Sequence, residues 1–222
     1  MLRRYFADLK AAKRNDPAVR GWFWYLHVIF AYPGFRALRF HIYARFFYLI
    51  RLRFIARLIN RFSHFLTGID IHPGARISRG VFIDHGTGVV IGETAVVGKN
   101  VVIYQGVTLG GTGKDKGKRH PTIKDNVMIS AGAKVLGNIT VGENSKIGAQ
   151  AVVLKDVPAN CTVVGVPARI VKGDPKEMDL YNKNKDLDPM MDEIISLKNQ
   201  IKKLEGVVEQ LKKDAKDNRE NK

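Results

Sequence analysis

The chain has 222 residues, which allows one or two domains, and its hydrophobic content of 45% is typical of a globular protein. Its single cysteine, Cys161, excludes an internal disulfide bond, and together with the lack of a recognisable signal peptide this favours the cytoplasm. The net charge of +16 could attract nucleic acid, an anionic membrane or a phosphorylated cofactor. RNA-binding aromatic motifs and zinc-finger spacings are absent, and the apolar run at 22–32 is too short to cross a bilayer, so we expect neither a nucleic-acid partner nor a transmembrane segment.

Basic helices are expected before residue 68. Residues 1–14 are typical of a short basic helix, and Asp16-Pro17 is typical of a helix start, because Asp caps free backbone amides and Pro is favoured in the first turn. This second helix should end at the turn dipeptide Pro33-Gly34. From 35 to 65, apolar residues recur at spacings of three and four with arginines between them, which predicts one or two amphipathic helices. We expect these helices to cover the apolar end of the repeat that follows rather than to enter a membrane.

An aliphatic repeat with a period of six occupies residues 71–153. Helices repeat their apolar face near 3.6 residues and strands near 2, so neither accounts for it. A triangular solenoid does, because three hexads make one coil and the aliphatic residues stack inside it. The fold class we predict is a left-handed parallel β-helix with an α-helical N-terminal domain. The repeating residues are Ile71, Ile77, Ile83, Val89, Ile91, Val97, Ile103, Leu109, Ile123, Ile129, Val135, Val141, Ile147 and Val153.

The period slips in two places, between Ile83 and Ile91 and between Leu109 and Ile123. A solenoid accommodates extra residues by extruding them onto its surface, where function tends to lie. The first slip contains residues 84–88 and the second contains the loop 110–121.

The C-terminal region combines an extended segment at 163–171 with a polar tail. Seven apolar residues of the tail alternate by four and three, which predicts a coiled coil; a single amphipathic helix folded onto its own body is the alternative. They are Met190, Ile194, Leu197, Ile201, Leu204, Val208 and Leu211. The expected domains are therefore helices at 1–67, the β-helix at 68–172, a linker at 173–189 and the coiled coil at 190–222.

Side chains capable of acid–base chemistry or of binding a charged group lie in and near the two slips of the period. They are Asp84-His85, Arg119-His120 and Asp70. An imidazole changes charge near neutral pH and suits a general base, and a carboxylate partner would orient it. Neighbouring side chains on a strand point to opposite faces, so Asp84 and His85 should have different roles. Asp70 and His85 lie slightly less than one coil apart and could meet across adjacent coils.

Several segments together resemble the serine O-acetyltransferases, hexapeptide-repeat enzymes that make O-acetylserine for cysteine biosynthesis. The likeness is close over 68–172 and thinner at Asp16-Pro-Ala and Gly34-Phe. Many acyltransferases share the hexads, whereas the combination of Asp-His-Gly-Thr-Gly with Arg-His-Pro is much more specific. The segments are Asp70-Ile-His-Pro-Gly-Ala, Asp84-His-Gly-Thr-Gly-Val-Val-Ile-Gly-Glu-Thr-Ala, Val107-Thr-Leu-Gly-Gly-Thr-Gly-Lys, Arg119-His-Pro and Gly165-Val-Pro-Ala-Arg-Ile-Val.

The resemblance implies roles for the charged residues. His85 would be the general base for direct attack of the serine hydroxyl on acetyl-CoA, with Asp70 as its partner. Asp84 and Asp16 would hold the amino group of L-serine, and Arg119 with His120 its carboxylate. Asp16 could equally be only a helix cap, and Arg119-His120 could be a solvated loop end.

The resemblance also implies acetyl-CoA as co-substrate, with no metal. The cofactor would lie between neighbouring solenoids of a homotrimer. Its pantetheine arm would pair with backbone at Gly111, Ala131 and Ala149, and Lys146 would lie near its phosphates. Cysteine is expected to inhibit because it would occupy the serine site.

Two departures from the family change the expected partners. Only about 67 residues precede the solenoid, so a hexamer is not expected, and the C-terminal Glu-Asn-Lys lacks the isoleucine that anchors O-acetylserine sulfhydrylase, so we expect no complex with that enzyme. The heptad tail could instead clamp three subunits. An acyltransferase for a sugar or another acceptor, and a non-enzymatic scaffold or membrane-surface protein, are the rival interpretations.

Overall fold

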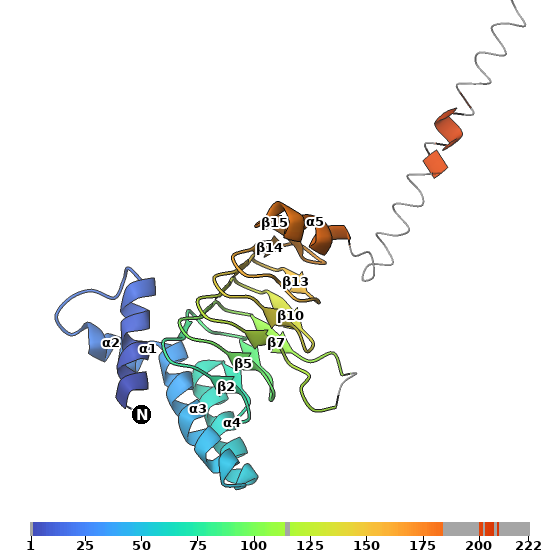
Figure 1. Cartoon of the computed structure of the whole chain (residues 1–222). Coiled ribbons are helices and arrows are strands. Elements are labelled where there is room, and N and C mark those ends of the chain that lie inside the picture. Colours follow the sequence, from blue (N-terminus) through green and yellow to red (C-terminus); the bar gives the residue numbers. More distant parts are fainter. Residues whose placement is uncertain (1, 114–115, 184–199, 202, 207, 209–222) are drawn as a thin grey trace, which may run out of the picture. The chain divides into compact units, whose positions relative to one another are not determined.

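The computed structural model describes residues 2–113, 116–183, 200–201, 203–206 and 208 (Figure 1). One compact unit spans Met1–Asn182, and Lys183–Lys222 form a second unit. In the second unit, residues 200–201, 203–206 and 208 are helical. Most of the heptad segment at 190–222 lies outside the described residues, so the coiled coil stays a prediction.

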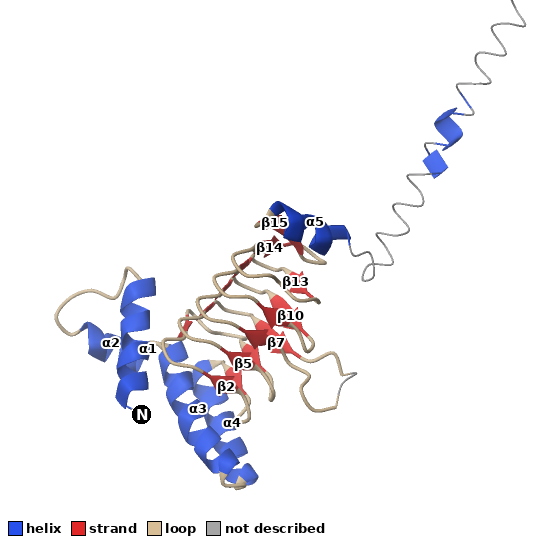
Figure 2. Ribbon diagram, in the orientation of Figure 1, coloured by secondary structure: helices blue, strands red, loops and turns tan. Residues whose placement is uncertain are grey.

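Four helices precede the solenoid: α1 (Leu2–Asn15), α2 (Trp24–Ala31), α3 (Pro33–Leu49) and α4 (Arg53–Thr67) (Figure 2). The predicted helix start at Asp16 is wrong. Asp16 instead closes a turn by accepting a hydrogen bond from the backbone N–H of Ala18 at 2.7 Å, and Gly21 then adopts a left-handed φ of +86°, which a helix cannot continue through. The predicted helix end before Pro33-Gly34 is confirmed, because α2 ends at Ala31. Pro33 also opens α3, since a proline is tolerated where the backbone N–H would be unpaired anyway.

Three sheets, parallel except at the last strand, wind into a triangular solenoid after α4 (Figure 2). The first face holds β1 (Asp70–Ile71), β4 (Val90–Ile91), β7 (Thr108–Gly110), β10 (Lys134–Leu136) and β13 (Val152–Val153). The second face holds β2 (Arg76–Ile77), β5 (Val96–Val97), β8 (Thr122–Ile123) and β11 (Thr140–Val141). The third face holds β3 (Phe82–Ile83), β6 (Val102–Ile103), β9 (Met128–Ile129), β12 (Lys146–Ile147), β14 (Thr162–Val164) and β15 (Arg169–Lys172).

The inward residue of each coil stacks on its equivalent in the next, so the six-residue period is confirmed. Ile71 pairs with Ile91, which in turn pairs with Leu109. These side chains are almost completely buried and form one continuous core. At about 25 cal/mol per Å² of buried apolar surface, this stack is the main favourable term in the stability of the solenoid.

A ladder of asparagines runs along the edge between the second and third faces. The four residues adopt left-handed φ angles of 55 to 59°, which asparagine tolerates better than most residues. Each side-chain amide donates to the carbonyl oxygen of the next, at 3.2, 3.1 and 3.1 Å. The ladder consists of Asn100, Asn126, Asn144 and Asn160.

The helices cover the first coil, as expected for a lid. The side of α4 that faces the body carries small or polar residues, and Gly34 of α3 approaches Ile83 so closely that a Cβ would lie 2.1 Å from its carbonyl oxygen. Asp8 of α1 accepts from the backbone N–H of Gly80 at 2.6 Å and pairs with Arg39 of α3. Within the described residues, no helix is long and apolar enough to cross a membrane.

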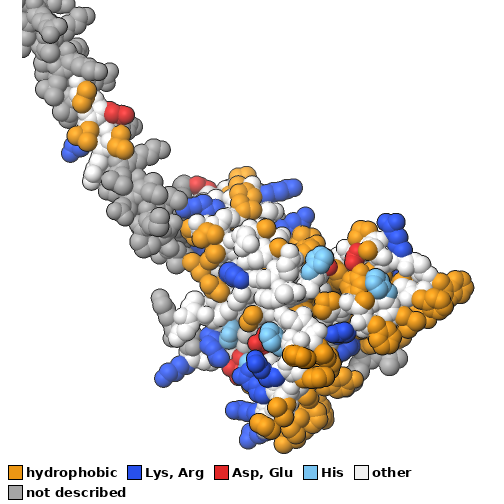
Figure 3. All heavy atoms as spheres, turned by 180° about the vertical axis from the view of Figure 1, so that it is seen from behind, with side chains coloured by type: hydrophobic (Ala, Val, Ile, Leu, Met, Phe, Trp, Pro, Cys, Tyr) orange, Lys and Arg blue, Asp and Glu red, His pale blue; other side chains and the backbone are white. Residues whose placement is uncertain are grey.

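Large exposed apolar side chains gather over the N-terminal helices (Figure 3). At the other end of the solenoid, β14 and β15 pair antiparallel and α5 (Pro175–Lys183) follows them. Cys161 is buried there as a small residue of the core.

Candidate active site

Two edges of the solenoid carry the candidate residues. The turns that lead from the third face to the first contain residues 84–89, 104–107, 130–133 and 148–151, and we call them the His85 edge. The turns that lead from the first face to the second contain residues 72–75, 92–95 and 111–121, and we call them the His120 edge. The first face lies between the two edges.

His85 lies at the tip of its turn with its side chain 74% exposed. Its φ of +55° is left-handed, and Gly86 and Gly88 beside it are also left-handed, so the chain doubles back and presents the imidazole outward. Asp84 accepts from the backbone N–H of His85 at 3.0 Å, and its carboxylate lies 4.0 Å from Nε2. The expectation that these two side chains point to opposite faces is wrong, because β3 ends at Ile83 and the strand alternation does not apply.

Asp16 joins this edge from the loop after α1. Its carboxylate accepts the hydroxyl proton of Tyr32, and this hydrogen bond is the main reason that the pKa of Asp16 is lowered. A positive charge on His85 lowers that pKa further, and the negative charge of Asp84 helps to raise the pKa of Tyr32, whose largest cause is burial. Asp16, Tyr32, Asp84 and His85 therefore share one neighbourhood, and Asp16 caps its own turn as well.

Asp70 lies at the start of β1, and its Oδ1 accepts from Asn60 of α4 at 2.9 Å. The turn that carries His85 stacks directly on the residues before Asp70, because Gly88 donates to the carbonyl of Gly68 at 2.9 Å. In the described part of the chain, the side chains of Asp70 and His85 form neither a hydrogen bond nor an ion pair with each other.

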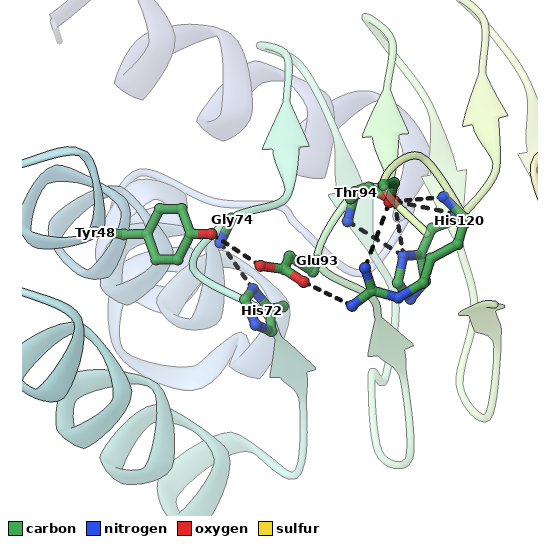
Figure 4. A network of polar contacts seen from close by, with 8 residues as sticks. Tyr48, His72, Gly74, Glu93, Thr94 and His120 are labelled. Carbon is green, nitrogen blue, oxygen red and sulfur yellow. Dashed lines mark hydrogen bonds and ion pairs between the residues drawn. The ribbon is translucent and has the colours of Figure 1, made fainter. Parts of the chain in front are cut away.

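On the His120 edge, Glu93 lies between Tyr48 and the turn that carries His120 (Figure 4), and it holds the guanidinium of Arg119. Nη2 of Arg119 lies 2.6 Å from Oε2 of Glu93, and Tyr48 of α3 donates to the other carboxylate oxygen at 2.9 Å. The hydrogen bond from Arg119, followed by that from Tyr48, lowers the pKa of Glu93. The ionised form of Glu93 is therefore favoured. Its carboxylate restrains the guanidinium through the Nη2 donor and leaves other N–H donors of Arg119 unused by Glu93.

His120 is buried, with 8% of its surface exposed, and is held by Thr94. Its Nδ1 lies 2.9 Å from Oγ1 of Thr94 and 3.2 Å from the Thr94 backbone nitrogen. The ring lies so close to Gly92 that a Cβ there would be 1.9 Å from Cδ2. Burial, followed by the charges of Arg119 and Lys118, lowers the pKa of His120.

The residues expected to contact the cofactor divide between the same two edges. Gly111 lies on the His120 edge, whereas Ala131 and Ala149 lie on the His85 edge. Lys146 is exposed on the third face. Among the described residues, the backbone N–H groups of Ala131 and Ala149 donate no hydrogen bond.

The residues that hold the predicted site residues in place were not predicted from the sequence. Tyr32, Asn60, Glu93 and Thr94 each contact a predicted site residue, yet none received a role. Glu93 and Thr94 could have been found, because they occupy the turn one coil before Arg119-His120. Tyr32 lies between α2 and α3, and Asn60 lies in α4, and the repeat does not determine where these helices are placed.

A cleft of about 430 Å³ opens beside the His120 edge, with Arg45, Tyr48, Glu93, Thr94 and Lys118 among its lining residues. Its charged lining residues are Arg45, Arg76 and Lys118, which are positive, and Glu93, which is negative. Within the described ranges, no cluster of His, Cys, Asp and Glu side chains could hold a metal ion.

The chain resembles characterised proteins over most of its length. Residues 120–155 match the family model described as bacterial transferase hexapeptide (six repeats). The serine acetyltransferase of Bacillus subtilis is 53% identical over 206 residues, which are 92% of this chain and 94% of that protein.

Two solved structures are similar in fold as well as in sequence. Serine acetyltransferase of Neisseria gonorrhoeae in complex with serine has a TM-score of 0.73 and 45% identity, covering 77% of this chain and 69% of that one. Serine acetyltransferase of Brucella abortus in complex with coenzyme A has a TM-score of 0.73 and 47% identity, covering 77% and 67%. These likenesses support the left-handed β-helix that the period predicts. The chain belongs to the serine acetyltransferase family.

Proposed function

We propose that this acyltransferase, which makes O-acetylserine from L-serine and acetyl-CoA, uses His85 as the general base for direct acetyl transfer. The observation that carries the proposal is the exposed imidazole of His85 beside the carboxylates of Asp84 and Asp16. That arrangement offers a proton acceptor next to two groups able to bind an ammonium ion.

The reaction needs no acyl-enzyme. The neutral imidazole of His85 takes the proton from the serine hydroxyl while that oxygen bonds to the thioester carbonyl carbon. The carbon–sulfur bond of the tetrahedral species then breaks, and the imidazolium returns the proton to the departing thiolate of CoA. Protons and charges balance within the site.

Asp70 is the residue toward which the His85 ring would turn during the reaction. It lies next to the residues on which the His85 turn stacks. Asn60 occupies Oδ1, and within the described chain Oδ2 makes no hydrogen bond, so one carboxylate oxygen remains for the imidazole.

Substrate recognition requires both edges. Asp84 and Asp16 would bind the ammonium of serine, and Arg119 with His120 its carboxylate. Because the first face separates the two edges in one chain, we infer that the His85 edge of one copy meets the His120 edge of a neighbouring copy in a homotrimer. The backbone amides of Ala131 and Ala149 and the backbone of Gly111 would then line one cleft for the pantetheine arm, with Lys146 near the phosphates.

Two further parts of the proposal concern regulation and assembly. Cysteine carries the same ammonium and carboxylate as serine, so it should compete for the site as an inhibitor.

The heptad seam at 190–211 would clamp three copies, and deleting residues 186–222 should then weaken the trimer in sedimentation analysis. The single free thiol and the use of acetyl-CoA favour the cytoplasm.

The decisive assay measures CoA release from acetyl-CoA with L-serine, in parallel with homoserine, glucosamine and a galactoside, each with and without cysteine. We expect release with serine that cysteine suppresses. CoA release with a sugar but not with serine would contradict serine as the substrate. No CoA release with any acceptor would contradict the enzymatic role.

A further inference from the structure

Thr94 has a hydrogen-bonding pattern that fixes the direction of its hydroxyl proton. Its Oγ1 accepts from the backbone N–H of Arg119 at 3.0 Å and from that of His120 at 3.1 Å. A hydroxyl has two acceptor lone pairs and one proton. With both lone pairs occupied, the proton must point to the remaining neighbour, which is Nδ1 of His120 at 2.9 Å.

A second donor converges on the same ring nitrogen. The backbone N–H of Thr94 points to Nδ1 of His120 at 3.2 Å. A nitrogen that accepts two hydrogen bonds carries no proton, so the neutral ring carries its proton on Nε2.

We propose that Thr94 is a positioning residue for the acetyl transfer: it holds His120 as the Nε2-protonated tautomer, and the ring thereby offers an N–H donor to the carboxylate of serine. This inference rests on the proposed function and adds a proton position and the residue responsible for it. Thr94 acts through His120 and is not itself a contact of the substrate.

The surroundings of His120 favour its neutral form. Burial, followed by the charges of Arg119 and Lys118, lowers the pKa of His120, whereas Glu93 opposes them. His72, one coil below, is also close enough to interact with it electrostatically. Arg119 then supplies a positive charge for the carboxylate, and His120 supplies a neutral directional donor.

The two hydrogen bonds from Thr94 also exclude the orientation in which the His120 ring is flipped by 180°. Gly92 leaves just enough room for the Cδ2 and Nε2 side of the ring, since a Cβ there would lie 2.1 Å from Nε2. Turning the ring over would place Cδ2 against both Thr94 donors and lose two hydrogen bonds.

The test uses Thr94→Val, which removes the hydroxyl at nearly constant shape, with Thr94→Ser as the conservative variant. Thr140→Val is the matched control, because the Thr140 hydroxyl forms no hydrogen bond within the described chain. Long-range ¹⁵N–¹H NMR of histidine-labelled, substrate-free enzyme reports the tautomer, and the His120 signal is identified by its loss in His120→Gln.

We expect the Nε2-protonated pattern in the wild type and in Thr94→Ser, and a detectable Nδ1-protonated population in Thr94→Val. The KM for serine should rise about tenfold in Thr94→Val, the equivalent of one hydrogen bond, with kcat changed less than about twofold. Thr94→Ser and Thr140→Val should stay near the wild type.

An Nδ1-protonated or averaging His120 in the wild type would overturn the proposal. So would a Thr94→Val variant, folded by circular dichroism, in which either the spectrum or the KM for serine stays unchanged. The tautomer is measured without turnover. A wild-type enzyme that releases no CoA with serine would therefore refute the proposed function, while the NMR spectrum would still show whether Thr94 sets the tautomer of His120.

Discussion

The His85 edge and the His120 edge present the same side chain in opposite ways. The imidazole of His85 is 74% exposed, and the carboxylate nearest to it, that of Asp84, lies 4.0 Å away. The imidazole of His120 is buried, and two donors converge on one of its nitrogens. A group that must take and return a proton needs freedom and access to substrate, whereas a group that recognises a carboxylate benefits from being fixed.

The contrast predicts that changes at the exposed edge reduce turnover and changes at the buried edge reduce affinity. His85→Asn should give the largest effect, lowering kcat by about 10²- to 10⁴-fold, because it removes the imidazole, the group on that edge best suited to general-base catalysis near neutral pH. CoA release measures the loss. Sedimentation and circular dichroism should match the wild type, and a kcat within threefold of it would refute His85 as the base.

Gly92→Ala should give the next largest effect. The new Cβ would lie 1.9 Å from Cδ2 of His120, so the ring must leave its position, and overpacking of this kind costs about 1–3 kcal/mol. We expect a raised KM for serine and a lower melting temperature. Gly206→Ala, which adds a methyl group in open space, is the control. An unchanged KM would show that the fixed ring is not needed for recognition.

Glu93→Gln tests the restraint on Arg119. The variant keeps the shape but removes the charge that orients the guanidinium at 2.6 Å, so the KM for serine should rise about tenfold while kcat changes little. Tyr48→Phe, which leaves the carboxylate in place, should have a smaller effect. Equal loss of kcat in Glu93→Gln would assign Glu93 to the reaction itself.

The smallest effect concerns the pH dependence of stability. Because the pKa of Glu93 is lowered in the folded protein, its contribution to the free energy of unfolding is present above the ordinary glutamate pKa and is lost as pH falls through the lowered value. The stability difference between wild type and Glu93→Gln should therefore shrink below about pH 4. Denaturant titrations across pH measure it, and a difference that grows on acidification would contradict the ion pair.

The sequence predicted the solenoid well because its core repeats. Each inward residue, such as Ile91 or Leu109, meets its own equivalent one coil away, so a linear period of six translates directly into packing. The helical region lacks such a rule. Asp16 and Pro17 are typical of a helix start, but the hydrogen bond from Ala18 and the left-handed Gly21 produce a turn instead.

The site was predicted in its main residues but not in its arrangement. The slips in the period located His85, Arg119 and His120, because extruded turns are visible in a repeat. The side chains that orient them come from two places. The register of the repeat places Thr94 one coil below His120, but the helices that supply the others have no such register. Asp70 and His85, expected to meet, instead contact Asn60 and Asp84.

The most direct test of the account asks whether one site is built from two copies. His85→Ala damages one edge and Arg119→Ala the other, and at a serine concentration well below the wild-type KM, where a loss of affinity also lowers the rate, each variant alone should release little CoA. Co-expressed and purified together, they should assemble at random, so that about a quarter of all sites pair two intact edges and about a quarter of wild-type CoA release is restored. Mixed trimers that recover no activity would contradict a site shared between neighbouring copies.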